Sequence, residues 1–126
     1  MNLGTDIGAI PDLTWQVREG FANLREALLR RLITPRGALW YAPNYGLDLR
    51  QYVNEALTPE VLEEVRILVE QECEKDPRVL LAQVGVWPEP QNRLVVGVRA
   101  ETDAGPVELV VRVDRVRVEV LNAYPG

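Results

Sequence analysis

Apolar residues in the first part of the chain recur at the spacing of an α-helix. Over about 20–34 every third or fourth position is apolar, which predicts a helix whose buried stripe is Phe21, Leu24, Leu28 and Leu32. Pro35 ends this helix, because the residue before a proline avoids the helical conformation. Residues 1–13 show little periodicity and are expected to form an extended arm, whereas residues 14–19 fit either a short strand or the start of the helix.

Two further helices are expected before residue 78. The shorter covers about 47–56, and the longer covers about 59–75, where Thr58 is a good N-cap and Pro59 is a good first helical residue. The buried stripe of the longer helix is Leu62, Val65, Val69 and Cys73. We therefore interpret Cys73 as a small core residue and not as a reactive thiol.

Beyond residue 78 the hydrophobic period falls to two, which predicts an antiparallel meander of three strands over about 79–87, 93–102 and 106–120. In the last strand the apolar residues stand at odd positions up to Val113 and at even positions from Val116. A strand cannot change parity without an extra residue, so we expect a bulge or break near Asp114-Arg115.

The predicted fold class is α+β, with N-terminal helices packed on one three-stranded sheet and residues 14–126 forming a single domain. A chain of 126 residues is long enough to bury one core. No segment reaches the ~20 apolar residues needed to cross a bilayer, and the first residues lack a basic region followed by an apolar stretch. We expect a soluble protein without a secretion signal.

Composition removes most kinds of catalytic site. The sequence contains no His and no Ser, which excludes Ser-His-Asp triads, Cys-His dyads and His-ligated zinc sites. Its single Cys allows neither an internal disulfide nor a CxxC motif, and its glycines form no phosphate-binding loop. We therefore expect no cofactor and no metal. The formal net charge of −5 and the lack of a basic face argue against nucleic-acid binding.

Paired carboxylates are the one catalytic device that 19 acidic residues could supply, and they keep a small glycosidase open as an alternative. Such an enzyme requires two carboxylates about 5–10 Å apart across a cleft, one of them with a raised pKa.

Several residues are candidates for contacts with a partner protein. Ile67 stands among acidic residues on the outer face of the longer helix, either as a contact or as one exposed apolar residue on a solvated face. Trp40, Tyr41 and Trp87 are interface anchors or core residues. The segment Val107–Val120 is long and uninterrupted, and a sheet edge of this kind can accept another strand.

The run LREALLRRLITPRGALWYAPNYGLDL, followed by an acidic helix, Asp76-Pro77-Arg78 and the strand meander, resembles the baseplate wedge family of contractile phage tails. This family includes the sheath-initiator wedge protein of T-even phages, the GPW proteins and the corresponding baseplate subunit of type VI secretion systems. The resemblance covers roughly residues 20–121. Its most specific part is the order and spacing of two turns, Thr34-Pro35-Arg36-Gly37 and Pro43-Asn44-Tyr45-Gly46.

The resemblance implies a structural protein of the virion tail baseplate, present in the host cytoplasm during assembly, and not an enzyme. Its implied partners are other baseplate wedge proteins, tail sheath subunits and tail tube or hub proteins, with no nucleic acid and no membrane among them. Sheath subunits would add strands to the C-terminal sheet, which gives a partner-binding role to Val107, Leu109, Val111, Val113, Arg115 and Arg117. A generic protein–protein adaptor, the other alternative, would show the same sheet without affinity for these neighbours.

Family members carry Glu-Pro-Arg at the junction between helix and strand, where it is associated with assembly, and Asp76-Pro77-Arg78 matches it. The acid is one methylene shorter in this chain. If the carboxylate must reach a partner, Asp weakens that contact; if it orients the neighbouring Arg or caps the backbone, Asp can replace Glu. A plain helix stop is the alternative interpretation of the tripeptide.

Overall fold

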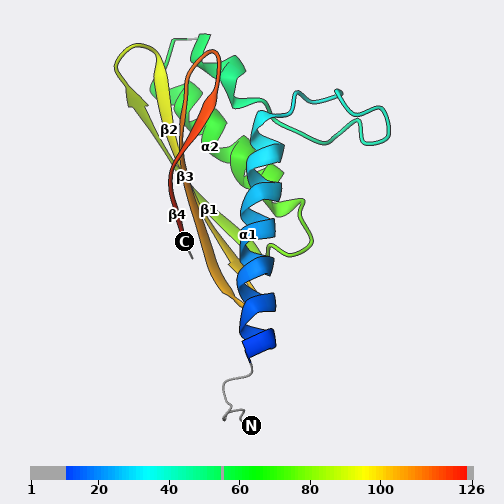
Figure 1. The fold of residues 1–126 in the computed structure, drawn as a ribbon. Coiled ribbons are helices and arrows are strands. Elements are labelled where there is room, and N and C mark those ends of the chain that lie inside the picture. Colours follow the sequence, from blue (N-terminus) through cyan, green and yellow to red (C-terminus); the bar gives the residue numbers. More distant parts are fainter. Residues whose placement is uncertain (1–10, 55, 125–126) are drawn as a thin grey trace.

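The protein folds into two layers, with the helices on one face of an antiparallel sheet (Figure 1). The computed structural model describes residues 11–54 and 56–124. In chain order the elements are α1 (Pro11–Ile33), the 3₁₀-helix η1 (Leu49–Asn54), α2 (Pro59–Glu74), β1 (Leu81–Glu89), β2 (Arg93–Thr102), β3 (Gly105–Val113) and β4 (Val118–Tyr124). Helix α2 packs against β1 and helix α1 against β3, so the core lies between the layers. The predicted α+β class is confirmed.

Helix α1 is longer than the sequence pattern predicts. It begins at Pro11, so the expected extended arm is wrong for residues 11–13, while residues 1–10 lie outside the described residues. Residues 14–19 are helical. Proline at the first helical position loses no hydrogen bond, because the first N–H groups of a helix have no partner within it. The predicted end before Pro35 is confirmed. The buried stripe is confirmed at Leu24, Leu28 and Leu32, with exposures of 2%, 0% and 0%, while Phe21 is partly buried.

Helix α2 follows the prediction closely. The hydroxyl of Thr58 accepts a hydrogen bond from the N–H of Val61 at 3.2 Å, and Pro59 is the first helical residue. Its inner face is fully buried at Val65, Val69 and Cys73. The shorter helix expected over about 47–56 is instead the tighter and shorter η1.

Cys73 is expected to be inert in the folded protein. Its side chain is fully buried, and burial raises the pKa of the thiol to about 12, so almost no reactive thiolate exists at pH 8. We expect a thiol reagent such as DTNB to label native Cys73 more than about a hundredfold more slowly than the urea-unfolded chain. Fast labelling under native conditions would show that the thiol is accessible, contrary to its place in the core.

Within the described residues the sheet has four strands, in the order β1-β2-β3-β4, one more than predicted. The segment expected to be one strand over about 106–120 is the hairpin of β3 and β4. The apolar residues change from odd to even positions where predicted, near Asp114-Arg115. The cause is a turn that reverses the chain there, and not a bulge within one continuous strand. The Asp114 carboxylate accepts hydrogen bonds from the N–H groups of Val116 and Arg117, both at 2.7 Å, and this side chain closes the turn.

Because β4 pairs with β3, the strand predicted as the open edge lies inside the sheet. The side chains of Val107, Leu109, Val111 and Val113 are 0–3% exposed and point into the core. The expectation that these residues offer a free edge is therefore wrong for this chain. Among the described strands, the edges are β1 and β4.

Strand β1 begins two residues later than expected, because the N–H of Val79 still donates to the Asp76 carbonyl in the turn after α2. Trp87 in β1 lies on the outer face of the sheet, 54% exposed, with its ring over Gly85 and Gly97. A Cβ at Gly85 would lie 2.5 Å from this ring, so glycine makes room for it.

No described helix is long and apolar enough to span a membrane.

Candidate partner interface

The two edges of the sheet differ in how well they can accept a further strand. Strand β1 contains Pro88, which has no N–H to donate and which typically protects an edge. Strand β4 contains no proline and no lysine, and its one charged residue is Glu119. The β4 edge is therefore the one that the sequence leaves open for pairing.

The hydrogen-bonding pattern of the β3–β4 hairpin determines which backbone groups of β4 point away from β3. The N–H of Asp114 donates to the Arg117 carbonyl at 3.0 Å, so these residues form a hydrogen-bonded pair. Such pairs alternate along an antiparallel ladder, so Val118 and Val120 direct their N–H and C=O groups away from β3. A bulge follows, at which Leu121 has no Cα partner on β3.

A groove runs between helix α1 and the β4 edge. It holds about 520 Å³, its apolar lining includes Leu29, Leu109 and Val120, and α1 also contributes the polar residues Glu19, Asn23 and Glu26. Val120 is 45% exposed although its side chain points toward α1. An added strand would place every second side chain over this groove.

Asp76-Pro77-Arg78 forms a rigid corner between α2 and β1. The Asp76 side chain is almost fully buried and accepts hydrogen bonds from the backbone N–H, Nε and Nη2 of Arg78 at 2.9, 2.9 and 2.7 Å. The hydrogen bonds from the Arg78 side chain lower the pKa of Asp76 most, against an opposing effect of burial. The short carboxylate thus caps the backbone and orients Arg78, while the guanidinium remains about half exposed.

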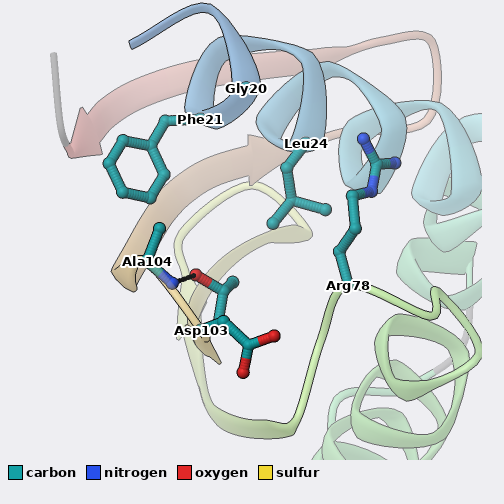
Figure 2. A pocket seen from close by; sticks show the side chains of 7 residues that line it. Gly20, Phe21, Leu24, Arg78, Asp103 and Ala104 are labelled. Atoms are coloured by element: carbon teal, nitrogen blue, oxygen red, sulfur yellow. Dashed lines mark hydrogen bonds between the residues drawn. The ribbon is translucent and has the colours of Figure 1, made fainter. Parts of the chain in front are cut away.

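The guanidinium of Arg78 stands beside a small pocket between α1 and the β2–β3 turn (Figure 2). The pocket holds about 240 Å³. Phe21, Leu24 and Ala104 provide its apolar walls, and Asp103 also lines it.

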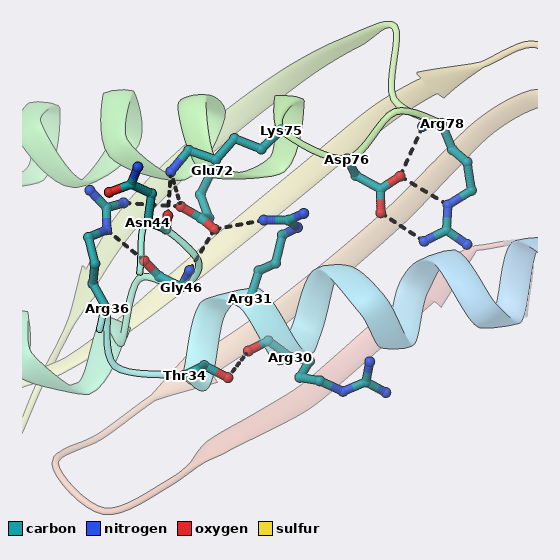
Figure 3. A network of polar contacts seen from close by, with 10 residues as sticks. All are labelled: Arg30, Arg31, Thr34, Arg36, Asn44, Gly46, Glu72, Lys75, Asp76 and Arg78. Atoms are coloured by element: carbon teal, nitrogen blue, oxygen red, sulfur yellow. Dashed lines mark hydrogen bonds and ion pairs between the residues drawn. The ribbon is translucent and has the colours of Figure 1, made fainter. Parts of the chain in front are cut away.

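A buried carboxylate organises the loop between α1 and η1 (Figure 3). Glu72 is fully buried in α2 and accepts hydrogen bonds from Arg31 Nη1 at 3.0 Å, Arg36 Nη2 at 3.1 Å, Lys75 Nζ at 3.0 Å and the Gly46 N–H at 2.9 Å. Burial alone would raise the pKa of Glu72, but the hydrogen bonds from Gly46, Lys75 and Arg31 outweigh it and lower the pKa below its usual range.

The same residues hold both ends of the loop. Arg36 Nε donates to the Gly46 carbonyl at 3.0 Å, Lys75 Nζ donates to the Asn44 carbonyl at 2.8 Å, and the Leu47 N–H donates to the Arg31 carbonyl at 2.8 Å. The loop itself extends away from the helices (Figure 1). Its conformation at the base is therefore fixed by α1 and α2.

The tip of this loop carries two exposed aromatic side chains. Trp40 is 88% exposed and Tyr41 67% exposed, and their rings meet edge to face with centroids 5.5 Å apart. Core packing, one of the two interpretations from the sequence, is thereby excluded for both residues in the isolated chain.

Stability should fall in acid, because the pKa values of Glu72 and Asp76 are lower in the folded chain than in the unfolded chain. Their contribution is complete above the unfolded pKa values of about 4 and is lost as the pH falls through the lower folded values. We expect the urea midpoint to decrease from pH 5 to pH 3, and to decrease less in Glu72→Gln. An equal decrease in both proteins would assign the effect to other acids.

The remaining candidates lie on separate surfaces. Ile67 is 40% exposed on α2 beside Arg66, which pairs with Glu63 and Glu70. Arg115 and Arg117 are exposed in the β3–β4 turn. The structure does not bring these residues together with Asp76-Pro77-Arg78 into one site, and their partner contacts stay predictions.

Nothing among the described residues favours carboxylate chemistry. The two buried acids with shifted pKa values, Glu72 and Asp76, are shifted downward, whereas a general acid requires an upward shift. Within residues 11–54 and 56–124, no group of three or more acidic or cysteine side chains is placed to hold a metal ion.

Sequence reasoning missed Glu72 and its partners Arg31 and Arg36. One signal was present: Glu72 follows Val65 by seven residues and Val69 by three, so it falls on the buried stripe of α2. A charged residue in such a position requires partners.

No protein-family model matches the chain, and no curated protein matches it.

Proposed function

We propose that this chain is a structural component of a contractile-tail baseplate wedge, and that it templates sheath assembly by accepting a partner strand at the β4 edge. The observation that carries the proposal is an edge without proline or lysine beside an open groove. The resemblance of residues 20–121 to the baseplate wedge family supplies the kind of assembly.

The proposed strand addition uses ordinary sheet chemistry. The outward N–H and C=O groups of Val118 and Val120 bond to the incoming backbone, which provides affinity. Alternate side chains of the incoming strand enter the groove against Leu29 and Val120, which sets the register. In this proposal the partner strand pairs with β4, and not with Val107–Val113 of β3 as expected from the sequence.

Other surfaces of the chain would bind the remaining partners. Arg78, oriented by Asp76 and half exposed, is proposed to contact other wedge proteins. Ile67 is a second proposed contact with wedge, tube or hub proteins, and Arg115 and Arg117 would bias the choice of sheath strand by charge. Neither nucleic acid nor a membrane is among the proposed partners.

Val120→Pro tests the strand-template role. Proline removes an N–H that faces away from β3, a position that sheet edges tolerate, so the fold should persist while one docking hydrogen bond is lost and the incoming strand is obstructed. We expect most tails assembled with this variant to lack sheath in negative-stain images. Val120→Ala, which keeps the N–H, is the matched control and should assemble sheath.

The comparison requires that both variants fold, which thermal melts of the purified chains establish. Sheathed tails as frequent with folded Val120→Pro as with wild type would rule out strand addition at this edge. A cryo-EM map of the assembled particle provides the direct check, since it shows which chain lies beside β4.

A further inference from the structure

Two features of the surface are complementary to each other: the Trp40 side chain at the loop tip and the apolar pocket beside Arg78. We propose that copies of this chain associate head to tail, with Trp40 of one copy seated in the pocket of the next. This inference does not depend on strand addition, because neither surface includes β4.

The pocket fits an aromatic side chain in size and polarity. Phe21, Leu24 and Ala104 leave an apolar space of about 240 Å³ that opens to solvent (Figure 2). Cavities of about 150 Å³ bind benzene, so this space is sufficient for the larger indole ring. The polar groups of Arg78 and Asp103 at the margin would remain in water and surround the contact, as is typical of a protein interface.

The loop presents Trp40 in a conformation that needs little ordering on binding. Its two ends are bonded to Glu72, directly through Arg36 and Gly46, and the ring of Tyr41 supports the indole edge to face. Binding therefore costs less conformational entropy than it would for a free loop. Trp is also the residue type most enriched at interface positions with large binding energies.

The pocket cannot be filled by the loop of its own chain. Leu24 lies nine residues before the end of α1, which places the pocket about 14 Å along the helix axis from the point where the loop begins. The loop extends away from that end of the helix (Figure 1) and is bonded to α2 at its base. A Trp40 side chain in this pocket would therefore have to come from another molecule.

Charge favours a second copy as that molecule. The network at the loop base combines Glu72 with Arg31, Arg36 and Lys75, which is a formal +2 in a chain of net charge −5. Of the two charged residues that line the pocket, Arg78 is paired with Asp76, whereas Asp103 makes no ion pair among the described residues. Seating Trp40 would bring this acid toward the cationic loop base.

The two surfaces are different, so the contact is heterologous. Each copy would have one loop and one pocket to offer, and repeated contacts produce a closed ring or an open chain. An anionic membrane is the other surface that a Trp-bearing loop beside cations could bind. We favour the pocket because the loop is anchored at both ends and turned by hydrogen bonds within it, and because the pocket is present on the same chain.

Sedimentation velocity of the full chain, from about 10 µM to about 1 mM, tests the proposal. Wild type should form species larger than a monomer as concentration rises. Trp40→Ala removes the anchor, and Gly20→Leu covers the mouth of the pocket with a side chain whose Cβ meets nothing within 4 Å. Each variant should associate at least about thirtyfold more weakly than wild type.

Mixing the two variants gives the sharpest result. Gly20→Leu keeps its loop and Trp40→Ala keeps its pocket, so an equimolar mixture should form a dimer that grows no further. Tyr124→Ala, which removes an exposed aromatic residue from β4, is the matched control and should associate like wild type. Both variants change exposed positions, and circular dichroism confirms that each is folded.

Three outcomes would overturn the proposal. These are a wild type that stays monomeric throughout, single variants that associate as strongly as wild type, and a mixture of folded variants that forms no dimer. Loss of association in Tyr124→Ala alone would assign the contact to the sheet edge. Trp40-dependent binding to vesicles of anionic phospholipid, without self-association, would identify a membrane contact instead.

Discussion

Replacing Glu72 with alanine is expected to destabilise the fold by about 3–5 kcal/mol. The carboxylate is fully buried and joins Arg31 on α1, Arg36 on the loop and the Gly46 N–H (Figure 3). Its removal leaves a largely buried guanidinium and a buried N–H without their acceptor. Urea unfolding at pH 7, followed by circular dichroism, measures the change.

Glu70→Ala on the same helix is the matched control. Glu70 pairs with Arg66 at the surface of α2, and both side chains are about a third exposed. Exposed pairs of this kind contribute at most about 1 kcal/mol, because water screens them. If Glu72→Ala costs no more than Glu70→Ala, then the network is not what holds the loop to the helices.

Removing the Glu72 carboxylate should also weaken the proposed head-to-tail association through Trp40. The loop ends depend on Glu72 for their hydrogen bonds, whereas the loop tip makes few contacts with the rest of the chain. Weakening the base would let the tip sample other conformations, and head-to-tail association would then carry a larger entropic cost.

The elements that could be predicted from the sequence are those with a strong local signal. Thr58-Pro59 starts α2 because side-chain capping and the fixed φ of proline act within one turn of helix. The alternation over 93–102 predicts β2 with the observed bounds, because its even positions face the core. In both places the signal needs no information from distant residues.

The β3–β4 hairpin shows why the rest could not be predicted. The turn sequence Asp114-Arg115-Val116-Arg117 has no Gly, Asn or Pro, and Asp114 is its one turn-favouring residue, so the signal of a reversal is weak. A change of parity fits a bulge and a hairpin equally well. The decisive interactions are the hydrogen bonds of the Asp114 carboxylate and the long-range bond from Arg50 Nη1 to the Val116 carbonyl, at 3.2 Å.

The loop network could not be predicted for a similar reason. Its residues are spread over α1, the loop and α2, and only the fold brings positions 31, 36, 46 and 72 together. The sequence did indicate two turns bracketing Trp40 and Tyr41. It could not show that one buried acid bonds to both turns and so fixes the base of the loop that carries the aromatic tip.

Replacing Gly46 with alanine is expected to destabilise the fold by about 2–5 kcal/mol. Gly46 has φ +103°, a conformation that costs a non-glycine residue roughly 1–3 kcal/mol. A Cβ there would also lie 2.3 Å from the Thr34 carbonyl oxygen, which belongs to the backbone, so the two loop ends must separate. Urea unfolding at pH 7 gives the magnitude.

Gly37→Ala separates these two causes. Gly37 lies in the same loop with φ +90°, but a Cβ there would meet nothing within 4 Å, so this variant should show the conformational cost alone. Gly46→Ala should also combine with Glu72→Ala to less than the sum of the two losses, because each breaks the hydrogen bond between Gly46 and Glu72. Equal losses in the two glycine variants would show that the loop ends can move apart freely, and then Trp40 would not be held in place by its base.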